Sequence, residues 1–195
     1  MTTFDGLIRN ERVNAGIVWT LTGIVGLTAV ESILTDALLW GGLGILVAGV
    51  IAAPAVVTGD WTVLVPWPLA LVAALALITR TLSLFIEPAG YVTVAALAQI
   101  VVAELDAFTS IDMTRRFAVA FSVLMTMAAQ GVWAIAQFYS DQWLGTTLLR
   151  SERELQWSFV IVTVVALIMG AAFEWYFKRV EHVGHDEHPQ RGGSL

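Results

Sequence analysis

The sequence predicts an all-α fold, a polytopic bundle of about six transmembrane helices with both ends of the chain in the cytoplasm. Three observations lead to this prediction. Of the 195 residues, 57% are hydrophobic and 13% are charged, whereas a typical soluble domain carries about 25% charged residues. The run from Phe117 to Tyr139 contains no formal charge, and Trp157 to Phe173 forms a second apolar run after a short polar segment. A hydrocarbon core of roughly 30 Å takes about 20 apolar residues to cross, so each run is a candidate span.

The first two spans are predicted over residues 13–34 and 38–57. The first is expected to be retained, because it is long and lacks the Ala-x-Ala-like exit of a cleaved signal peptide. Glycines reduce the bulk of the second span, so a neighbouring backbone can approach it closely. These glycines are Gly41, Gly42, Gly44 and Gly49.

The third and fourth spans are predicted over residues 64–85 and 89–103. Pro66 and Pro68 fall in the first turn of the third span, where a missing N–H costs little. Glu87-Pro88 is expected to end that span, and Arg80 is expected to extend its head group outward from near the end. The fourth span is predicted to be the shortest, with an end that can extend as far as residue 108. The last two spans cover residues 117–139 and 157–173.

Orientation follows from the positive charges in the short loops, which are enriched on the cytoplasmic side. Placing the N-terminus inside puts seven basic residues inside: Arg9, Arg12, Arg115, Arg116, Lys178, Arg179 and Arg191. It puts three outside: Arg80, Arg150 and Arg153.

Tryptophans are expected near the membrane surfaces, where amphipathic rings are enriched. Those near predicted span ends are Trp40, Trp143 and Trp157 outside and Trp61, Trp67 and Trp175 inside. Trp19 and Trp133 lie deeper and are expected to pack between helices.

The predicted organisation is a cytoplasmic segment over residues 1–12, a transmembrane domain over 13–180 and a disordered cytoplasmic tail over 181–195. The predicted location is the cell membrane, with the lipid bilayer as the main partner. A net charge of −6 argues against nucleic acid as a partner. The absence of cysteine excludes disulfides and thiolate sites. No cofactor or metal is predicted, since the tail histidines stand beside Pro189 and glycines; they are His182, His185 and His188.

Polar residues recur at helical spacing within the predicted spans, which indicates faces turned toward the protein interior. The candidate polar seam consists of Gln130, Gln137, Asp141, Thr163 and Glu174. A face of the first span is expected to join it or to serve as a packing face of small residues; it carries Gly16, Thr20, Gly23 and Glu31. One interpretation is a small hydrated cavity or ion path. The other is that the amides and hydroxyls bond between helices, while both carboxylates act as caps and anchors at the membrane surface.

A second group of carboxylates precedes the fifth span. Glu104, Asp106 and Asp112 could hold a divalent cation, which prefers oxygen ligands. The simpler interpretation is that they pair with Arg115 and Arg116, with Asp112 capping the helix.

The segment Gln137-Phe138-Tyr139-Ser140-Asp141-Gln142-Trp143-Leu144-Gly145-Thr146, with Gln156-Trp157 after it, resembles part of the YjdF-like inner-membrane proteins. The whole chain is similar to uncharacterised multi-pass membrane proteins of haloarchaea, whose acidic, lysine-poor balance it shares. It departs from the first family at Leu148-Leu149-Arg150, where that family has an acidic-rich segment, and it lacks a His-Tyr-Asp-Arg-like motif before the fifth span. The resemblance implies a topology and a source, and it implies no activity.

Two functional hypotheses follow. The first is a non-enzymatic membrane protein, either a small transporter-like unit or a structural subunit that forms homo-oligomers or joins a membrane complex. The alternative is an intramembrane enzyme that uses acidic residues at helix ends: Asp141, Glu174 or the pair Glu104 and Asp106. An enzyme requires two or more acidic groups that converge on one pocket.

Overall fold

The computed structural model describes residues 11–82, 86–108, 115–148, 156–157, 159–168 and 171, and every regular element within these ranges is a helix. The helices are α2 (Glu11–Leu34), α3 (Leu38–Thr58), α4 (Trp67–Thr81), α5 (Ile86–Phe108) and α6 (Arg115–Leu144). A further apolar helix covers Phe159–Ile168. The predicted all-α class is therefore confirmed. Glu174, Trp175 and the predicted tail lie outside the described residues.

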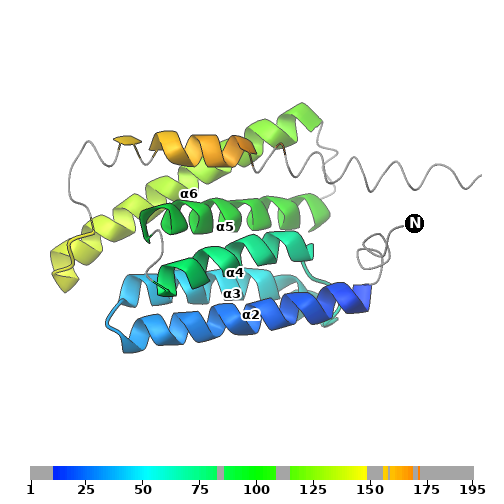
Figure 1. The fold of residues 1–195 in the computed structure, drawn as a ribbon. Helices are drawn as coiled ribbons and strands as arrows, with labels where there is room; N and C mark the ends of the chain where they lie inside the picture. The colour runs from blue at the N-terminus through cyan, green and yellow to red at the C-terminus, as the bar shows by residue number, and fades with distance from the viewer. Residues whose placement is uncertain are drawn as a thin grey trace, which may run out of the picture.

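The helices lie side by side as a bundle, with α2 and α3 on one side, α4 and α5 between, and α6 crossing obliquely on the other side (Figure 1). Helix α5 is central, because it packs against α3, α4 and α6. Helix α2 packs against α3 and α4. Its connection to α3 is short, and Asp36 takes a left-handed conformation there with φ 61°, which aspartate tolerates better than most residues.

Several boundaries of α4, α5 and α6 differ from the sequence prediction. Helix α4 begins at Trp67, not Leu64, and with 15 residues it is the shortest of α2–α6. Helix α5 has 23 residues and begins at Ile86, so the prediction that this span is the shortest is wrong. Glu87-Pro88 therefore lies in the first turn of α5, where proline is tolerated, and does not end α4. Helix α6 continues beyond Tyr139 to Leu144.

The close approach predicted for the glycines of α3 is confirmed at two of the four positions. A Cβ at Gly41 would lie 3.0 Å from the carbonyl oxygen of Ala29, and one at Gly44 would lie 2.8 Å from the Ala29 Cβ. Gly42 and Gly49 have open space beside them. The α2–α3 contact therefore depends on glycine at the two positions that face α2.

The start of α2 anchors the loop between α3 and α4. The Asn14 side chain donates to the Val65 carbonyl (3.2 Å) and accepts from the Trp67 backbone N–H (2.9 Å). The Trp19 indole N–H donates to the Trp61 carbonyl (3.1 Å). Trp19 lies on the exposed side of α2, so the expectation that it packs between helices is wrong. Its hydrogen bond to the loop explains this position.

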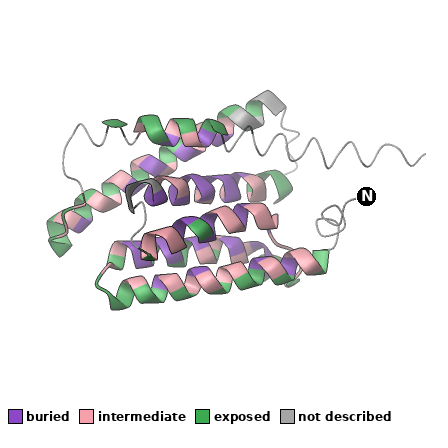
Figure 2. Ribbon diagram, viewed as in Figure 1, coloured by how far each residue is buried: buried purple, intermediate pink, exposed green. Residues whose placement is uncertain are grey.

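Apolar side chains occupy both the core and much of the outer surface of the bundle. Many large apolar residues of α2, α3 and α6 are exposed. Figure 2 marks the exposed positions in green along α2 and α6. The buried polar residues are Thr93, Gln99, Ser122, Thr126, Gln130 and Ser140. Four of the described helices are long and apolar enough to cross a membrane, within Glu11–Leu34, Leu38–Thr58, Ala89–Ala107 and Ala120–Leu144. Such a surface fits a lipid environment, which covers apolar side chains that water would not.

Candidate functional site

A buried polar face of α6 packs against α5. Ser122, Thr126 and Gln130 are spaced by four residues and are all buried, so they share one face of the helix. The Gln99 side chain of α5 donates to the Ser122 hydroxyl, and the Thr126 hydroxyl donates to the Ser122 carbonyl (2.8 Å). Gln130 is 1% exposed, and its Oε1 has no hydrogen-bond partner among the described residues. Polar contacts between helices thus lie at the α5–α6 interface.

The predicted seam residues farther along α6 sit in a local hydrogen-bonded structure. Asp141 is half-buried, and its Oδ1 accepts from the Thr146 hydroxyl (2.5 Å) and the Leu148 backbone N–H (2.8 Å). The Ser140 and Thr146 hydroxyls lie 2.9 Å apart. Asp141 therefore orders the segment after α6, while Gln137, one turn earlier, is half-buried.

Among the described residues, no hydrogen bond joins Thr163 to these positions. The Thr163 hydroxyl donates to the Phe159 carbonyl within its own helix (2.7 Å), and Glu174 lies outside the described residues. The interior position expected for the small-residue face of α2 is wrong. Gly16, Thr20 and Gly23 are exposed, and α2 instead buries a face of Ala15, Val18, Val25 and Ala29. These aliphatic side chains are larger than the glycines of the exposed face, and they fill the contact of α2 with α3 and α4.

An aromatic cluster that the sequence did not indicate lies where four helices meet. The Arg80 guanidinium carbon is 4.7 Å from the centre of the Trp40 ring. Trp40 packs edge-on against Trp133 at 5.2 Å, and a Cβ at Gly90 would lie 2.8 Å from the Trp40 ring. Trp40 is 6% exposed, so its ring packs between helices near the start of α3, and the packing of Trp133 between helices is confirmed.

Arg80 also differs from expectation. Its Nε is buried and has no hydrogen-bond partner among the described residues, and its guanidinium packs on the Trp40 ring. A cation over an aromatic ring is stabilised by the ring quadrupole. Arg80 therefore ties the end of α4 to the start of α3. Forty residues separate the two in the sequence, and no local pattern marks the pair.

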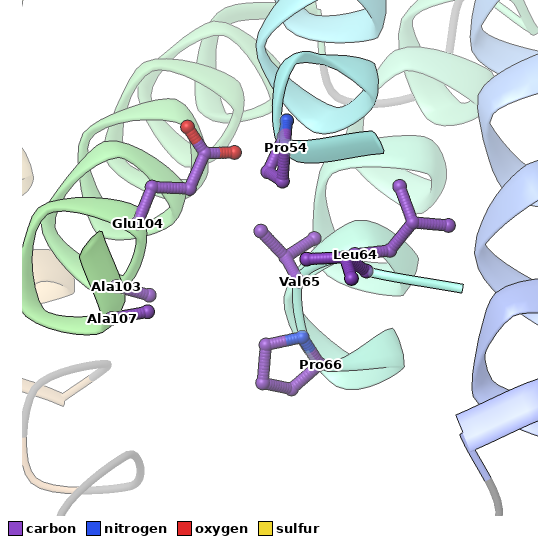
Figure 3. Close-up of a pocket in the computed structure, with 8 residues that line it drawn as sticks. Pro54, Leu64, Val65, Pro66, Ala103, Glu104 and Ala107 are labelled. Carbon is purple, nitrogen blue, oxygen red and sulfur yellow. The ribbon is translucent and has the colours of Figure 1, made fainter. Parts of the chain in front are cut away.

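A cavity of about 100 Å³ lies at the opposite end of the bundle, near the end of α5. It is lined by Pro54, Val63, Leu64, Val65, Pro66, Ala103, Glu104 and Ala107 (Figure 3). The Glu104 carboxyl group points toward Pro54 of α3. Its Oε1 is buried and has no hydrogen-bond partner among the described residues.

The acidic cluster predicted around Glu104 divides in the structure. Glu104 turns inward, Asp106 is exposed, and Asp112 lies outside the described residues. Among the described residues, no three His, Asp or Glu side chains come together to hold a metal ion. Of the carboxylates that the structure describes, only that of Glu104 lines the cavity.

Comparison with known families gives one partial match. Residues 2–64 match a family described as a domain of unknown function (DUF8268). This match covers about a third of the chain, including α2, α3 and most of the loop that Asn14 and Trp19 hold. No curated protein and no solved structure matches the chain.

Proposed function

We propose that this chain is a six-span integral protein of the cell membrane, with both ends in the cytoplasm, that serves as a non-enzymatic structural subunit by associating with further copies of itself. The outward-facing apolar surface and the inward-facing polar residues support the membrane assignment. The excess of basic residues at the ends and loops assigned to the inner side supports the orientation.

The exposed face of α2 carries the structural-subunit proposal. Gly16, Thr20 and Gly23 lie one turn apart along this face. A Cβ added at position 16 or 23 would have nothing within 4 Å, and the Thr20 hydroxyl bonds to the Gly16 carbonyl of its own helix (2.8 Å). In lipid, helices associate through small residues that let backbones approach closely. A helix face that only meets lipid has no need of such residues.

Disulfide cross-linking in native membranes tests this proposal, because the chain has no cysteine of its own. The variant Thr20→Cys should form cross-linked dimers on mild oxidation. The matched control Val132→Cys lies on an exposed apolar position of α6 and should remain monomeric. Equal cross-linking of the two variants, or none in either, contradicts the proposal.

A transporter-like unit is the second candidate, and the Glu104 cavity favours it. A carboxylate within a membrane span is costly and commonly marks a ligand or ion site. The enzyme alternative has less support from the described residues. Asp141 lies near the end of α6 and Glu104 near the end of α5, and these two helices run in opposite directions (Figure 1). The two carboxylates therefore do not share a pocket.

A further inference from the structure

The Glu104 cavity presents a hydrogen-bond acceptor, and the described residues that line it carry no side-chain donor. The seven other lining residues are proline, valine, leucine or alanine. Pro54 and Pro66 also lack a backbone N–H. The Val63 N–H already donates to the Asp60 carbonyl (3.2 Å). A donor for Glu104 Oε1 is therefore best supplied by a molecule that enters the cavity.

The walls come from three parts of the chain that the fold holds in place. Ala103 and Ala107 stand on α5 beside Glu104, and their small side chains leave room around the carboxyl group. Pro54 belongs to α3. The segment Val63–Pro66 is fixed by Asn14, which bonds to the Val65 carbonyl and the Trp67 N–H. Ala107 is exposed and Glu104 is half-buried, so the cavity reaches the surface near the end of α5.

The chemistry of the walls distinguishes among possible cations. A divalent metal ion prefers six or more oxygen ligands, whereas this cavity contains one carboxylate and apolar side chains. An isolated charge without a partner is costly to bury. A small alkylammonium ion satisfies both parts of the cavity, because its N–H can donate to the carboxylate while its methyl groups contact apolar walls. An apolar cavity of about 150 Å³ binds benzene, so a cavity of about 100 Å³ suits a ligand of only a few non-hydrogen atoms.

We propose that the cavity between Pro54, Val65 and Glu104 is a binding site for a small alkylammonium ion, with Glu104 as its counter-ion and hydrogen-bond acceptor. This site goes beyond the structural role and does not depend on the association of copies through α2. If the protein is a transporter-like unit, this site identifies small alkylammonium ions as the class of ligand.

Calorimetric titration of the full chain in detergent tests the site with two probes of similar size and equal charge. Trimethylammonium has one N–H and tetramethylammonium has none. We expect saturable binding of trimethylammonium that is at least about tenfold tighter, since hydrogen bonds to charged groups are the strong ones. Equal affinities, or no binding of either ion, would overturn the proposal.

Substitutions locate the binding to the cavity. Glu104→Gln should weaken trimethylammonium binding at least about tenfold, whereas Asp106→Asn, an exposed position two residues away, should leave it unchanged. Ala103→Leu keeps the carboxylate and fills the cavity, so it should weaken binding to a similar extent. Potassium chloride at the same ionic strength should not displace the ligand. Unchanged affinity in either Glu104→Gln or Ala103→Leu contradicts the proposal, and this result is independent of the cross-linking of Thr20→Cys.

Discussion

The guanidinium carbon of Arg80 lies 4.7 Å from the centre of the Trp40 ring, so the end of α4 and the start of α3 are joined by a cation and an aromatic face. Trp133 of α6 packs edge-on against the Trp40 ring, and Gly90 of α5 lies close to the same ring. Four helices therefore meet at one tryptophan. This end of the bundle depends on close packing around Trp40, which makes it sensitive to added volume.

We expect Gly90→Ala to destabilise the protein, because the new Cβ would lie 2.8 Å from the Trp40 ring. Overpacking of this kind costs about 1–3 kcal/mol. Gly131→Ala on α6 is the matched control, since nothing lies within 4 Å of a Cβ there. Thermal unfolding in detergent measures both. A Gly90→Ala protein as stable as Gly131→Ala would show that the contact with Trp40 relaxes freely.

Asn14→Ala should loosen the loop between α3 and α4. The substitution removes hydrogen bonds to the Val65 carbonyl and the Trp67 N–H, and an unsatisfied buried polar group costs about 1–3 kcal/mol. Hydrogen exchange at the Trp67 amide should become faster. Thr20→Ala serves as the control, because its hydroxyl bonds only within α2. Unchanged exchange at Trp67 in Asn14→Ala would contradict this role.

Asp60 makes the loop sensitive to acid. Hydrogen bonds from the Thr62 backbone N–H (2.9 Å) and hydroxyl (2.7 Å) lower the pKa of the Asp60 carboxyl below its usual value. A carboxyl whose pKa is lower in the folded state stabilises it above the unfolded pKa, which is about 3.9, and this stabilisation is lost as pH falls through the lower folded value. In an NMR titration, Thr62→Val should raise the pKa of Asp60. An unchanged titration curve would contradict the role of the hydroxyl.

Parts of this architecture follow from the sequence because they depend on local composition. Long apolar runs predict helices that cross a membrane, and the glycines of α3 predict a close neighbour, which Gly41 and Gly44 have. The boundary between α4 and α5 could not be predicted from local composition. In a sequence, a proline in the first turn of a helix looks the same as a proline that follows the end of a helix. Pro88 lies in the first turn of α5.

The candidate site was less accessible to sequence reasoning. Periodicity identified the buried Gln130, but it also suggested an interior position for Gly16, Thr20 and Gly23, which are exposed. Helical spacing identifies which residues share a face of a helix, but it does not show whether another helix packs against that face. The Glu104 cavity requires α3, the 59–66 loop and α5 to converge, and this convergence depends on tertiary contacts such as those of Asn14. In the sequence, Glu104 belongs to a group of three carboxylates, and the pattern does not distinguish it from Asp106, which is exposed.

Labelling of single cysteines in intact cells tests most directly the claim that the chain crosses the membrane with its N-terminus inside. Because the native chain has no cysteine, Thr35→Cys reports on the connection between α2 and α3, and Thr62→Cys reports on the loop between α3 and α4. A membrane-impermeant maleimide should label Thr35→Cys at once and Thr62→Cys only after the cells are permeabilised. Labelling of Thr62→Cys before permeabilisation, or protection of Thr35→Cys, would contradict the account.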